Sequence, residues 1–420
     1  MKPGVVQFVR TDAPAFLSEL LETLAERGRS LLGRRPALET RGRSLTELAD
    51  DLLSRRGEAS GTAIAAALVA RFESADEAEL RSFLAALVDR FGPDRAAIER
   101  AIAAYTAEPS AQHAAALHVA AEPRRQELIR RINLAPGGTA ALVRMRAALL
   151  RMRDDDPSFA AVDADFLHLF MSWFNRGFLM PRRIGWTTPI NILEKIIRYE
   201  AVHAIRGWDD LRNRLEPSDR RCYGFFHPQL VDEPLIFVEV ALTKSIPAAI
   251  GPLLDPARRA ISADEADTAV FYSISNTQRG LAGVSFGNFL IKQVVEDLRR
   301  ELPGLTCFVT LSPVPGFAAW LAKNPDADIS RAAARYFLHA KDLNGKPLDP
   351  VARFHLGNGA RLERINPDGD PSERGMKQSK GLMVNYLYDL DAIEANHEAF
   401  AEAGTVMASA AIRRLVEGAK

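Results

Sequence analysis

The sequence predicts a protein of two parts, an α-helical N-terminal part followed by a mixed α/β C-terminal part. From about residue 12 to 180, apolar residues recur at three- and four-residue spacing, which is typical of amphipathic helices. After residue 181, short runs rich in β-branched and aromatic residues appear, with a Gly-rich loop and a helical pattern between two of them. We therefore expect a helical bundle over residues 1–180 and an α/β domain over residues 181–420.

Helix start and stop signals punctuate the N-terminal part. Ser44-Leu-Thr-Glu47 and Ser74-Ala-Asp-Glu77 each have the pattern of a capping box, in which side chains satisfy the free amides of the first helical turn. Stops are predicted at the sites Gly92-Pro93, Glu122-Pro123, Pro136-Gly137-Gly138 and Asp156-Pro157. The helices between them carry no catalytic motif, so we expect this domain to pack against the second half and to build an oligomer.

Three runs in the C-terminal part are predicted strands, over residues 234–243, 269–275 and 305–311. Between the second and third runs, residues 284–300 have apolar positions at helical spacing and basic residues in the last turn. The order strand, loop, helix, strand predicts a mixed α/β domain.

The charge and composition of the chain limit which partners it can bind and in which compartment we expect it. Lys plus Arg and Asp plus Glu number 54 each, so the chain has no global basic field for nucleic acid or an anionic membrane. The sequence has no apolar stretch of about 18 residues, the length of a membrane span, and no signal-peptide pattern. Its two cysteines, Cys222 and Cys307, form neither a metal cluster nor a disulfide framework. We expect a cytoplasmic protein that binds neither membrane nor nucleic acid.

The loop over residues 276–288 is a candidate anion site. It leads from a predicted strand into a predicted helix and contains Gly280, Gly283 and Gly287, with Arg279 adding a positive charge. Unpaired amides at a helix N-terminus bind phosphate oxygens, and glycine lets the backbone come close to a ligand. The spacing is neither Gly-x-Gly-x-x-Gly nor a Walker A loop. The alternative is that the glycines only form a tight strand-to-helix turn.

Ser312 and His355 are the candidate reactive side chains. Ser312 follows the third strand in Leu311-Ser-Pro-Val-Pro-Gly-Phe317, where two prolines prevent the strand from continuing, although a serine there is also common in turns. His355 precedes a Gly-Asn-Gly turn, where a side chain can be held in a cleft. No Gly-x-Ser-x-Gly elbow surrounds Ser312. Four other histidines lie on helical patterns and are assigned structural or surface roles: His113, His118, His168 and His397.

Several blocks of sequence, taken together and in this order, resemble the malonyl-CoA decarboxylase family. The strongest of them cover residues 271–284, 311–317, 354–360 and 381–386, and weaker ones cover residues 173–179, 190–193, 199–203 and 220–223. The resemblance implies a helical N-terminal oligomerisation domain and a catalytic domain of acetyltransferase-like (GNAT-type) fold. In that fold a Gln/Arg-x-x-Gly-x-Gly/Ala loop holds the pyrophosphate of coenzyme A, and Gln278-Arg-Gly-Leu-Ala-Gly283 departs from this spacing.

The resemblance also implies the site residues and the reaction. Ser312 and His355 become the catalytic pair. The malonyl-CoA loop comprises Gln278, Arg279, Gly280, Leu281, Ala282, Gly283, Val284, Ser285, Phe286, Gly287 and Asn288. The implied reaction converts malonyl-CoA to acetyl-CoA and carbon dioxide without metal or cofactor, in a homo-oligomer that is a tetramer or a dimer.

For the mechanism we expect Ser312 to position the malonyl carboxylate and a protonated His355 to donate a proton to the α-carbon. The opposite division of roles stays open, as do the number of subunits, the breadth of acyl groups and the pathway. One alternative function is an acyl-CoA N-acyltransferase of the same fold, which predicts thiol release that depends on an amine. A second alternative is a noncatalytic coenzyme A-binding protein, which predicts binding without turnover.

Overall fold

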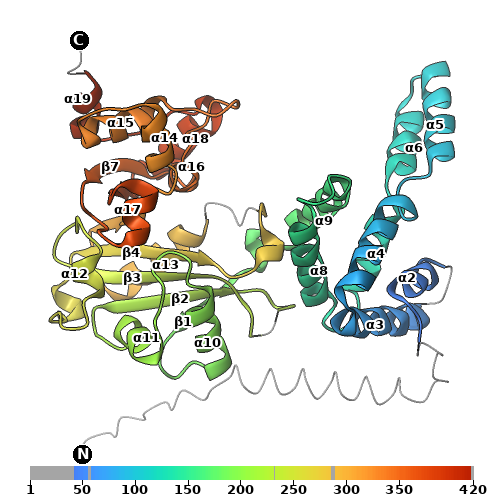
Figure 1. Cartoon of the computed structure of the whole chain (residues 1–420), viewed down its shortest axis with the longest axis horizontal. Coiled ribbons are helices and arrows are strands. Elements are labelled where there is room, and N and C mark those ends of the chain that lie inside the picture. The colour runs from blue at the N-terminus through green and yellow to red at the C-terminus, as the bar shows by residue number, and fades with distance from the viewer. Residues whose placement is uncertain (1–41, 55–57, 231, 285–288, 418–420) are drawn as a thin grey trace, which may run out of the picture.

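The structure is a computed structural model and describes residues 42–54, 58–230, 232–284 and 289–417. Within these ranges the N-terminal part is helical and the C-terminal part is built on a mixed sheet, which confirms the predicted fold class (Figure 1). The N-terminal helices are α2 (Leu45–Leu53), α3 (Glu58–Ser74), α4 (Glu77–Asp89), α5 (Arg95–Ala107), α6 (Ala111–Ala121), α7 (Arg124–Asn133), α8 (Gly138–Met152) and α9 (Phe159–Trp173).

One of the two predicted capping boxes is confirmed and the other is wrong. Ser44 caps α2, because its Oγ accepts from the amide of Glu47 while the Glu47 carboxylate accepts from the amide of Ser44. Ser74 is instead the last residue of α3, and the carboxylate of Asp76 caps α4. The two sequences have the same spacing, so the pattern alone did not reveal that α3 extends to Ser74 and that Asp76 takes the capping position. The four predicted helix stops all fall at breaks between helices, although Gly138 is itself the first residue of α8.

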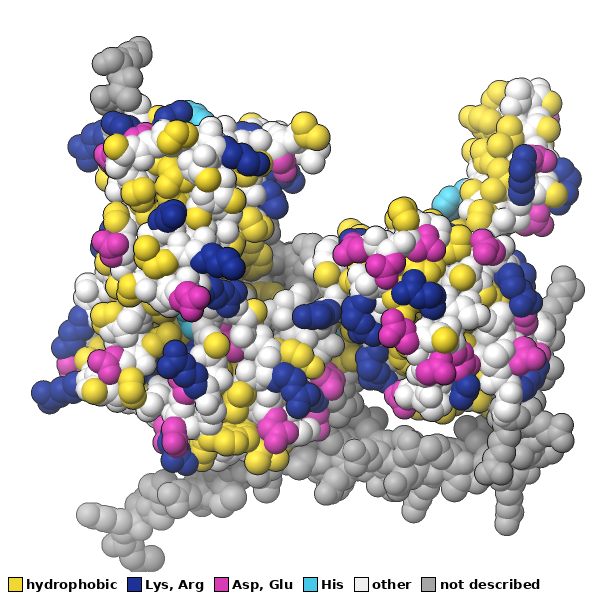
Figure 2. Space-filling view, in the orientation of Figure 1, with side chains coloured by type: hydrophobic (Ala, Val, Ile, Leu, Met, Phe, Trp, Pro, Cys, Tyr) yellow, Lys and Arg dark blue, Asp and Glu magenta, His cyan; other side chains and the backbone are white. Residues whose placement is uncertain are grey.

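Helices α5 and α6 form a hairpin that projects from the rest of the protein (Figure 1). All of their residues are described, and none of them is buried. Apolar side chains gather on this hairpin at the upper right of Figure 2. Among the apolar residues of the two helices, Ile102 is 48% exposed and Val119 is 71% exposed. The hairpin therefore has an apolar surface that the described part of the chain leaves uncovered.

The C-terminal sheet has the strand order β1-β2-β3-β4-β5-β8-β6, with β7 paired to β8. Its strands are β1 (Met180–Ile184), β2 (Arg220–Phe226), β3 (Pro234–Thr243), β4 (Thr268–Asn276), β5 (Cys307–Thr310), β6 (Ser312–Pro313), β7 (Arg361–Asn366) and β8 (Met383–Leu387). Neighbouring strands are antiparallel except for β4 and β5, which run parallel. Helix α13 (Phe289–Glu301) connects β4 to β5, as predicted, and a parallel pair requires a crossover of this kind. The order of strand, helix and strand confirms the predicted mixed α/β domain.

The remaining helices pack around this sheet and carry part of the site. They are α10 (Ile190–Tyr199), α11 (Trp208–Leu215), α12 (Gly251–Leu254), α14 (Phe317–Lys323), α15 (Ile329–His339), α16 (Pro350–Gly357), α17 (Glu373–Ser379), α18 (Ile393–Ala403) and α19 (Ala410–Glu417). Short 3₁₀ turns are η1 (Arg176–Phe178), η2 (Ala263–Glu265) and η3 (Arg279–Leu281). No helix among the described residues is long and apolar enough to cross a membrane.

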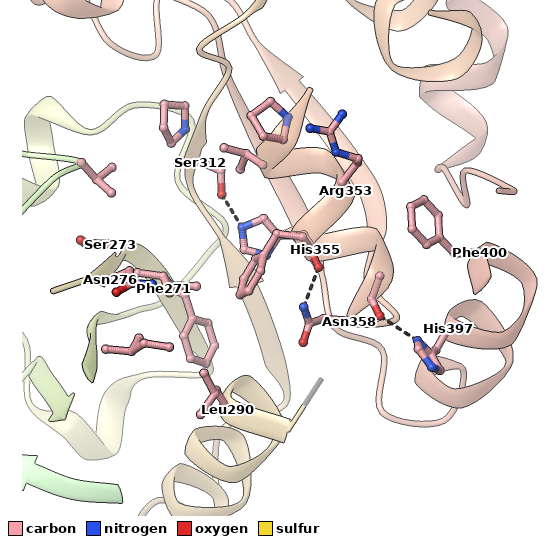
Figure 3. Close-up of a pocket in the computed structure, with 18 of the residues that line it drawn as sticks. Phe271, Ser273, Asn276, Leu290, Ser312, Arg353, His355, Asn358, His397 and Phe400 are labelled. Carbon is pink, nitrogen blue, oxygen red and sulfur yellow. Dashed lines mark hydrogen bonds between the residues drawn. The ribbon is translucent and has the colours of Figure 1, made fainter. Parts of the chain in front are cut away.

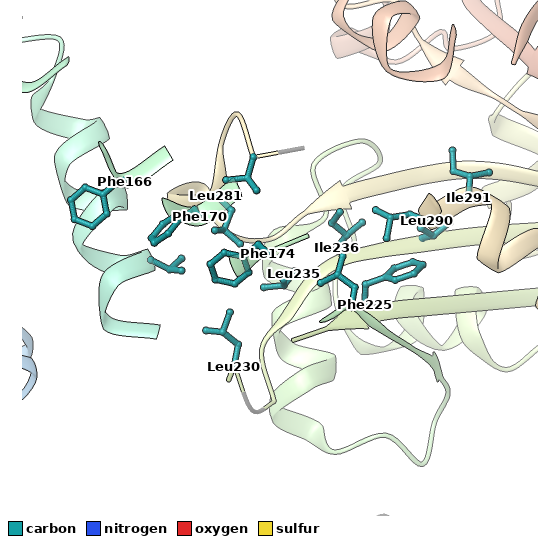
Figure 4. Packing of buried hydrophobic residues seen from close by; sticks show 14 of the residues in the cluster. Phe166, Phe170, Phe174, Phe225, Leu230, Leu235, Ile236, Leu281, Leu290 and Ile291 are labelled. Atoms are coloured by element: carbon teal, nitrogen blue, oxygen red, sulfur yellow. The ribbon is translucent and has the colours of Figure 1, made fainter. Parts of the chain in front are cut away.

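A single hydrophobic cluster extends from the helical part into the sheet domain. It contains Phe166, Phe170 and Phe174 from α9 and its end, together with Leu281 from η3 and Phe225 from β2. Figure 4 shows Leu281 beside the α9 phenylalanines, with the strand residues beyond it. The two parts of the chain are therefore packed together by apolar side chains at η3, which lies within the predicted malonyl-CoA loop.

Candidate active site

Ser312 lies where β5 ends and the short strand β6 begins. The chain turns after Thr310, and β6 pairs with β8 through Ser312 and Val384 before the prolines stop it. Ser312 is 5% exposed, and its Oγ is 2.8 Å from Oγ1 of Thr310, to which it donates. Thr310 Oγ1 in turn accepts from the amide of Tyr386 at 3.1 Å. The serine hydroxyl is thus held by the edge of the sheet rather than by a mobile turn.

His355 reaches Ser312 from the last turn of α16. Asp349 caps this helix through the amide of Ala352, and Pro350 occupies the first helical turn, where a missing N–H has no consequence. His355 Nε2 lies 3.2 Å from Ser312 Oγ, and its Nδ1 lies 2.8 Å from the phenol oxygen of Tyr388 (Figure 3). The two side chains predicted as a pair, 43 residues apart in sequence, therefore meet directly.

Aromatic rings surround the imidazole and keep water away from it. The Tyr386 ring stacks on His355 with centroids 4.7 Å apart, and the Phe354 ring meets it edge-on at 5.0 Å. Burial lowers the pKa of His355 from 6.5 to about 3, so the imidazole is neutral at neutral pH in the free protein. Burial also raises the pKa of Tyr388, which keeps its phenol protonated. The predicted protonated His355 therefore does not describe the free protein.

A neutral imidazole allows two hydrogen-bond arrangements along this chain of groups. In the first, Tyr388 donates to Nδ1, Nε2–H donates to Ser312, and Ser312 donates to Thr310. In the second, Ser312 donates to Nε2 and Nδ1–H donates to Tyr388. Both arrangements give Ser312 and His355 their hydrogen-bond partners. The hydroxyl proton of Ser312 can therefore point to Thr310 or to His355.

A cavity of about 600 Å³ opens beside the pair. Ser312 and His355 line one region of it, and Phe271 and Leu290 contribute apolar surface (Figure 3). Asn276, just before the predicted malonyl-CoA loop, and Val284, within it, also line the cavity. One continuous space therefore joins the serine–histidine pair to the described part of that loop, as a long acyl thioester would require.

Comparison with known proteins decides the family. A family model described as the malonyl-CoA decarboxylase C-terminal domain matches residues 177–331 and 326–420, and one described as the N-terminal domain of that enzyme matches residues 91–174. This chain belongs to the malonyl-CoA decarboxylase family.

Individual members of the malonyl-CoA decarboxylase family agree with this assignment. The crystal structure of the Rhodopseudomonas palustris enzyme matches with a TM-score of 0.84 at 61% identity, covering 88% of this chain and 98% of that chain. The mitochondrial enzyme of Mus musculus is 32% identical over 409 residues, 82% of each chain. That of Anser anser anser is 34% identical over 336 residues, 66% of each chain. The family is one of carboxy-lyases, and these matches do not favour the N-acyltransferase alternative.

The loop proposed to bind malonyl-CoA is only partly exposed. Arg279, Ala282 and Gly283 are exposed, whereas Gly280 and Leu281 are buried. The side chain of Gln278 donates to Glu233 at 3.2 Å. Four loop residues, Ser285, Phe286, Gly287 and Asn288, lie outside the described residues. The described residues can thus offer a ligand the Arg279 guanidinium and the backbone of residues 282–284.

Two loop glycines are required for different reasons. A Cβ on Gly280 would lie 1.9 Å from the carbonyl oxygen of Val143 in α8, so this glycine admits a helix of the N-terminal part rather than a ligand. Gly283 has φ of +79°, a conformation that other residues rarely adopt. The sequence predicted that another group would approach the loop backbone closely at a glycine. At Gly280 this prediction is correct, but the approaching group is the backbone of α8 and not a ligand.

Sequence reasoning missed three contributors to the site. Thr310 and Tyr388 contact Ser312 and His355, yet neither belongs to a motif that signals this role. His397, assigned a structural or surface role, lines the cavity, and its Nδ1 lies 2.7 Å from the carbonyl oxygen of Gly357. Within the described ranges, no group of three or more His, Cys, Asp or Glu side chains is arranged to hold a metal ion.

Proposed function

We propose that this chain converts malonyl-CoA to acetyl-CoA and carbon dioxide, with Ser312 and His355 as its catalytic residues. The observation that carries the assignment of residues is the 3.2 Å contact between Ser312 Oγ and His355 Nε2 on the wall of the cavity. Membership of the malonyl-CoA decarboxylase family supplies the reaction.

The substrate supplies its own electron sink. When the bond from the α-carbon to the carboxylate breaks, its electron pair passes to the thioester carbonyl and forms an enolate, while carbon dioxide leaves. The enolate then takes one proton at the α-carbon to give acetyl-CoA. The protein has to orient the carboxylate, stabilise the enolate oxygen and deliver that proton, so no metal or organic cofactor is required by the chemistry.

Ser312 and His355 divide these tasks according to their surroundings. The Ser312 hydroxyl donates to the malonyl carboxylate and holds it in the cavity. The carboxylate brings a negative charge close to His355, and a nearby opposite charge favours the imidazolium that burial alone disfavours. His355 therefore takes up a proton when substrate binds and gives it to the α-carbon after carbon dioxide leaves. Tyr388 holds the ring through Nδ1.

The coenzyme A half of the substrate lies along the loop over residues 278–288. Support comes from the cavity, which is lined by Asn276 just before the loop and by Val284 within it. Arg279 provides an exposed positive charge there for a phosphate group.

We further propose a cytoplasmic homo-oligomer, a dimer or a tetramer. A second copy covering the α5–α6 hairpin would bury apolar side chains such as Ile102 and Val119. The free thiols of Cys222 and Cys307 suit a reducing compartment, although the mouse and goose relatives are named mitochondrial enzymes. Light scattering of the purified protein and fractionation of the host cell test these two points.

The decisive test is product analysis by mass spectrometry after mixing the protein with malonyl-CoA and a chelator. We expect acetyl-CoA from the wild type, and its loss in Ser312→Ala and His355→Ala. The exposed Ser262 and His339 provide matched controls, because neither lines the cavity, so Ser262→Ala and His339→Ala remove the same groups outside it and should retain activity. Intact malonyl-CoA with folded wild-type protein, or thiol release only when an amine is added, would refute the proposal.

A further inference from the structure

Arg146 of α8 is a buried cation that joins the helical part to the substrate loop. It is 2% exposed. Its Nε donates to the Asp163 carboxylate in α9 at 2.7 Å, and its Nη1 donates to the carbonyl oxygen of Gly280 in η3 at 2.8 Å. One guanidinium thus connects two helices of the N-terminal part to the backbone of the loop proposed to hold coenzyme A.

The surroundings of Gly280 show that the loop is seated closely on α8. There is no space for a Cβ between Gly280 and Val143, because that atom would overlap the Val143 carbonyl. The next residue, Leu281, is fully buried and belongs to the same cluster as Phe170 (Figure 4). The carbonyl that Arg146 holds therefore lies at the centre of the contact between the helical part and the loop.

A buried ion pair is a poor explanation for stability alone. Removing a guanidinium and a carboxylate from water carries a large desolvation penalty, and apolar residues of similar volume often stabilise a core equally well. Asp163 also has a second partner, since Arg153 Nη1 lies 2.9 Å from its other oxygen. What an apolar side chain at position 146 could not provide is the hydrogen bond to the Gly280 carbonyl.

The loop connects this contact to the cavity. Asn276 precedes the loop and Val284 lies within it, and both line the cavity. No cavity-lining residue among those described comes from the helical part, since the first of them in sequence is Val202. Among the described residues, the hydrogen bond to Gly280 therefore links Arg146 to the loop that reaches the cavity.

We propose that Arg146 is a positioning residue for the coenzyme A half of malonyl-CoA. By fixing the Gly280 carbonyl, it holds the backbone of residues 278–284 in the conformation that receives the nucleotide and diphosphate of the substrate. This inference rests on the proposed function. It assigns Arg146 to substrate affinity and leaves bond breaking and protonation to Ser312 and His355.

The test compares two substrates in Arg146→Met, which keeps an unbranched side chain but removes the guanidinium and its donors. Malonyl-CoA has the nucleotide and diphosphate, whereas S-malonyl-pantetheine has the same reacting thioester without them. We expect the KM for malonyl-CoA to rise about tenfold, which corresponds to about 1.4 kcal/mol, while kcat stays within about twofold. The KM for S-malonyl-pantetheine should not change. A merely structural arginine would lower the active fraction for both substrates alike.

Two further variants keep the result interpretable. Arg144→Met on the same helix removes an exposed ion pair with Glu73 and should leave both KM values unchanged. Gly280→Ala displaces the loop from α8 while Arg146 itself is unchanged, so it should cause the same selective rise in the KM for malonyl-CoA. This second variant still tests the inference if Arg146→Met fails to fold.

The outcomes separate this inference from the proposed function. If the wild type does not decarboxylate malonyl-CoA, the proposed function is wrong. Two results with an active wild type would refute only the role of Arg146. In the first, Arg146→Met and Gly280→Ala have an unchanged KM for malonyl-CoA. In the second, both variants have a lower kcat to the same extent with the two substrates.

Discussion

The proton that His355 takes up on substrate binding predicts an unusual pair of pH profiles. Lowering its pKa from 6.5 to about 3 disfavours the imidazolium in the free protein by roughly 5 kcal/mol. A substrate carboxylate about 4 Å from the ring stabilises the imidazolium by about 4 kcal/mol at an effective dielectric constant of about 20. That amount corresponds to about three pH units, so the pKa of His355 in the complex should lie near ~6.

The two kinetic parameters report on different states and should therefore differ. Because kcat depends on the complex, it should be constant below about pH 6 and fall about tenfold per unit above it. Because kcat/KM depends on the free protein, it should fall about tenfold per unit across the whole range from about pH 5 to 8. Steady-state decarboxylation assays at constant ionic strength measure both. A plateau in kcat/KM that breaks near the ordinary pKa of 6.5 would show that burial does not control His355 and would refute the reasoning.

Three other predictions concern the site and the stability of the fold. Tyr388→Phe removes the phenol 2.8 Å from His355 Nδ1 while keeping the ring, so kcat should fall by up to about tenfold, the worth of one hydrogen bond; unchanged kcat would exclude an orienting role for Tyr388. Ser44→Ala should destabilise the protein by about 1 kcal/mol in urea denaturation, because Ser44 caps α2. The control Ser74→Ala should stay within about 0.5 kcal/mol, and equal effects would contradict the corrected assignment of the caps. His203 has its pKa lowered from 6.5 to about 4, mainly by burial, so the unfolded chain binds a proton that the folded chain does not within that window. The melting temperature should therefore decrease as the pH falls from 6.5 towards about 4, and His203→Gln should reduce the slope; an unchanged slope in the variant would assign it to other groups.

The sequence predicted the sheet domain well because its strands are defined by local composition. The run over residues 234–243 coincides with β3, and the run over residues 269–275 falls within β4. β3 is buried along nearly its whole length, and its residues form an apolar run interrupted only by Glu239 before the final Thr243, which can be recognised without knowledge of neighbouring strands. The crossover between β4 and β5 followed from the helical pattern of residues 284–300.

Features that depend on distant parts of the chain could not be predicted in the same way. A glycine reports that a Cβ is excluded, but not which atoms exclude it, so Gly280 pointed to a ligand although α8 fills the space. Tyr388 contacts His355 only because β8 lies beside β5 and β6, and nothing near it in sequence marks that contact. Helical periodicity likewise predicted the N-terminal helices without showing that α5 and α6 bury none of their residues within this chain.

The contact between Arg146 and the Gly280 carbonyl has a practical consequence for judging variants of this protein. If Arg146 has the proposed role, substitutions in the helical part raise the KM for malonyl-CoA and leave kcat unchanged. An assay at saturating malonyl-CoA would give such a variant the same rate as the wild type. Only an assay at low substrate concentration would reveal the defect. Variants in α8 and α9 should therefore be compared at the concentrations that prevail in the cell, even though neither helix supplies a residue to the described cavity wall.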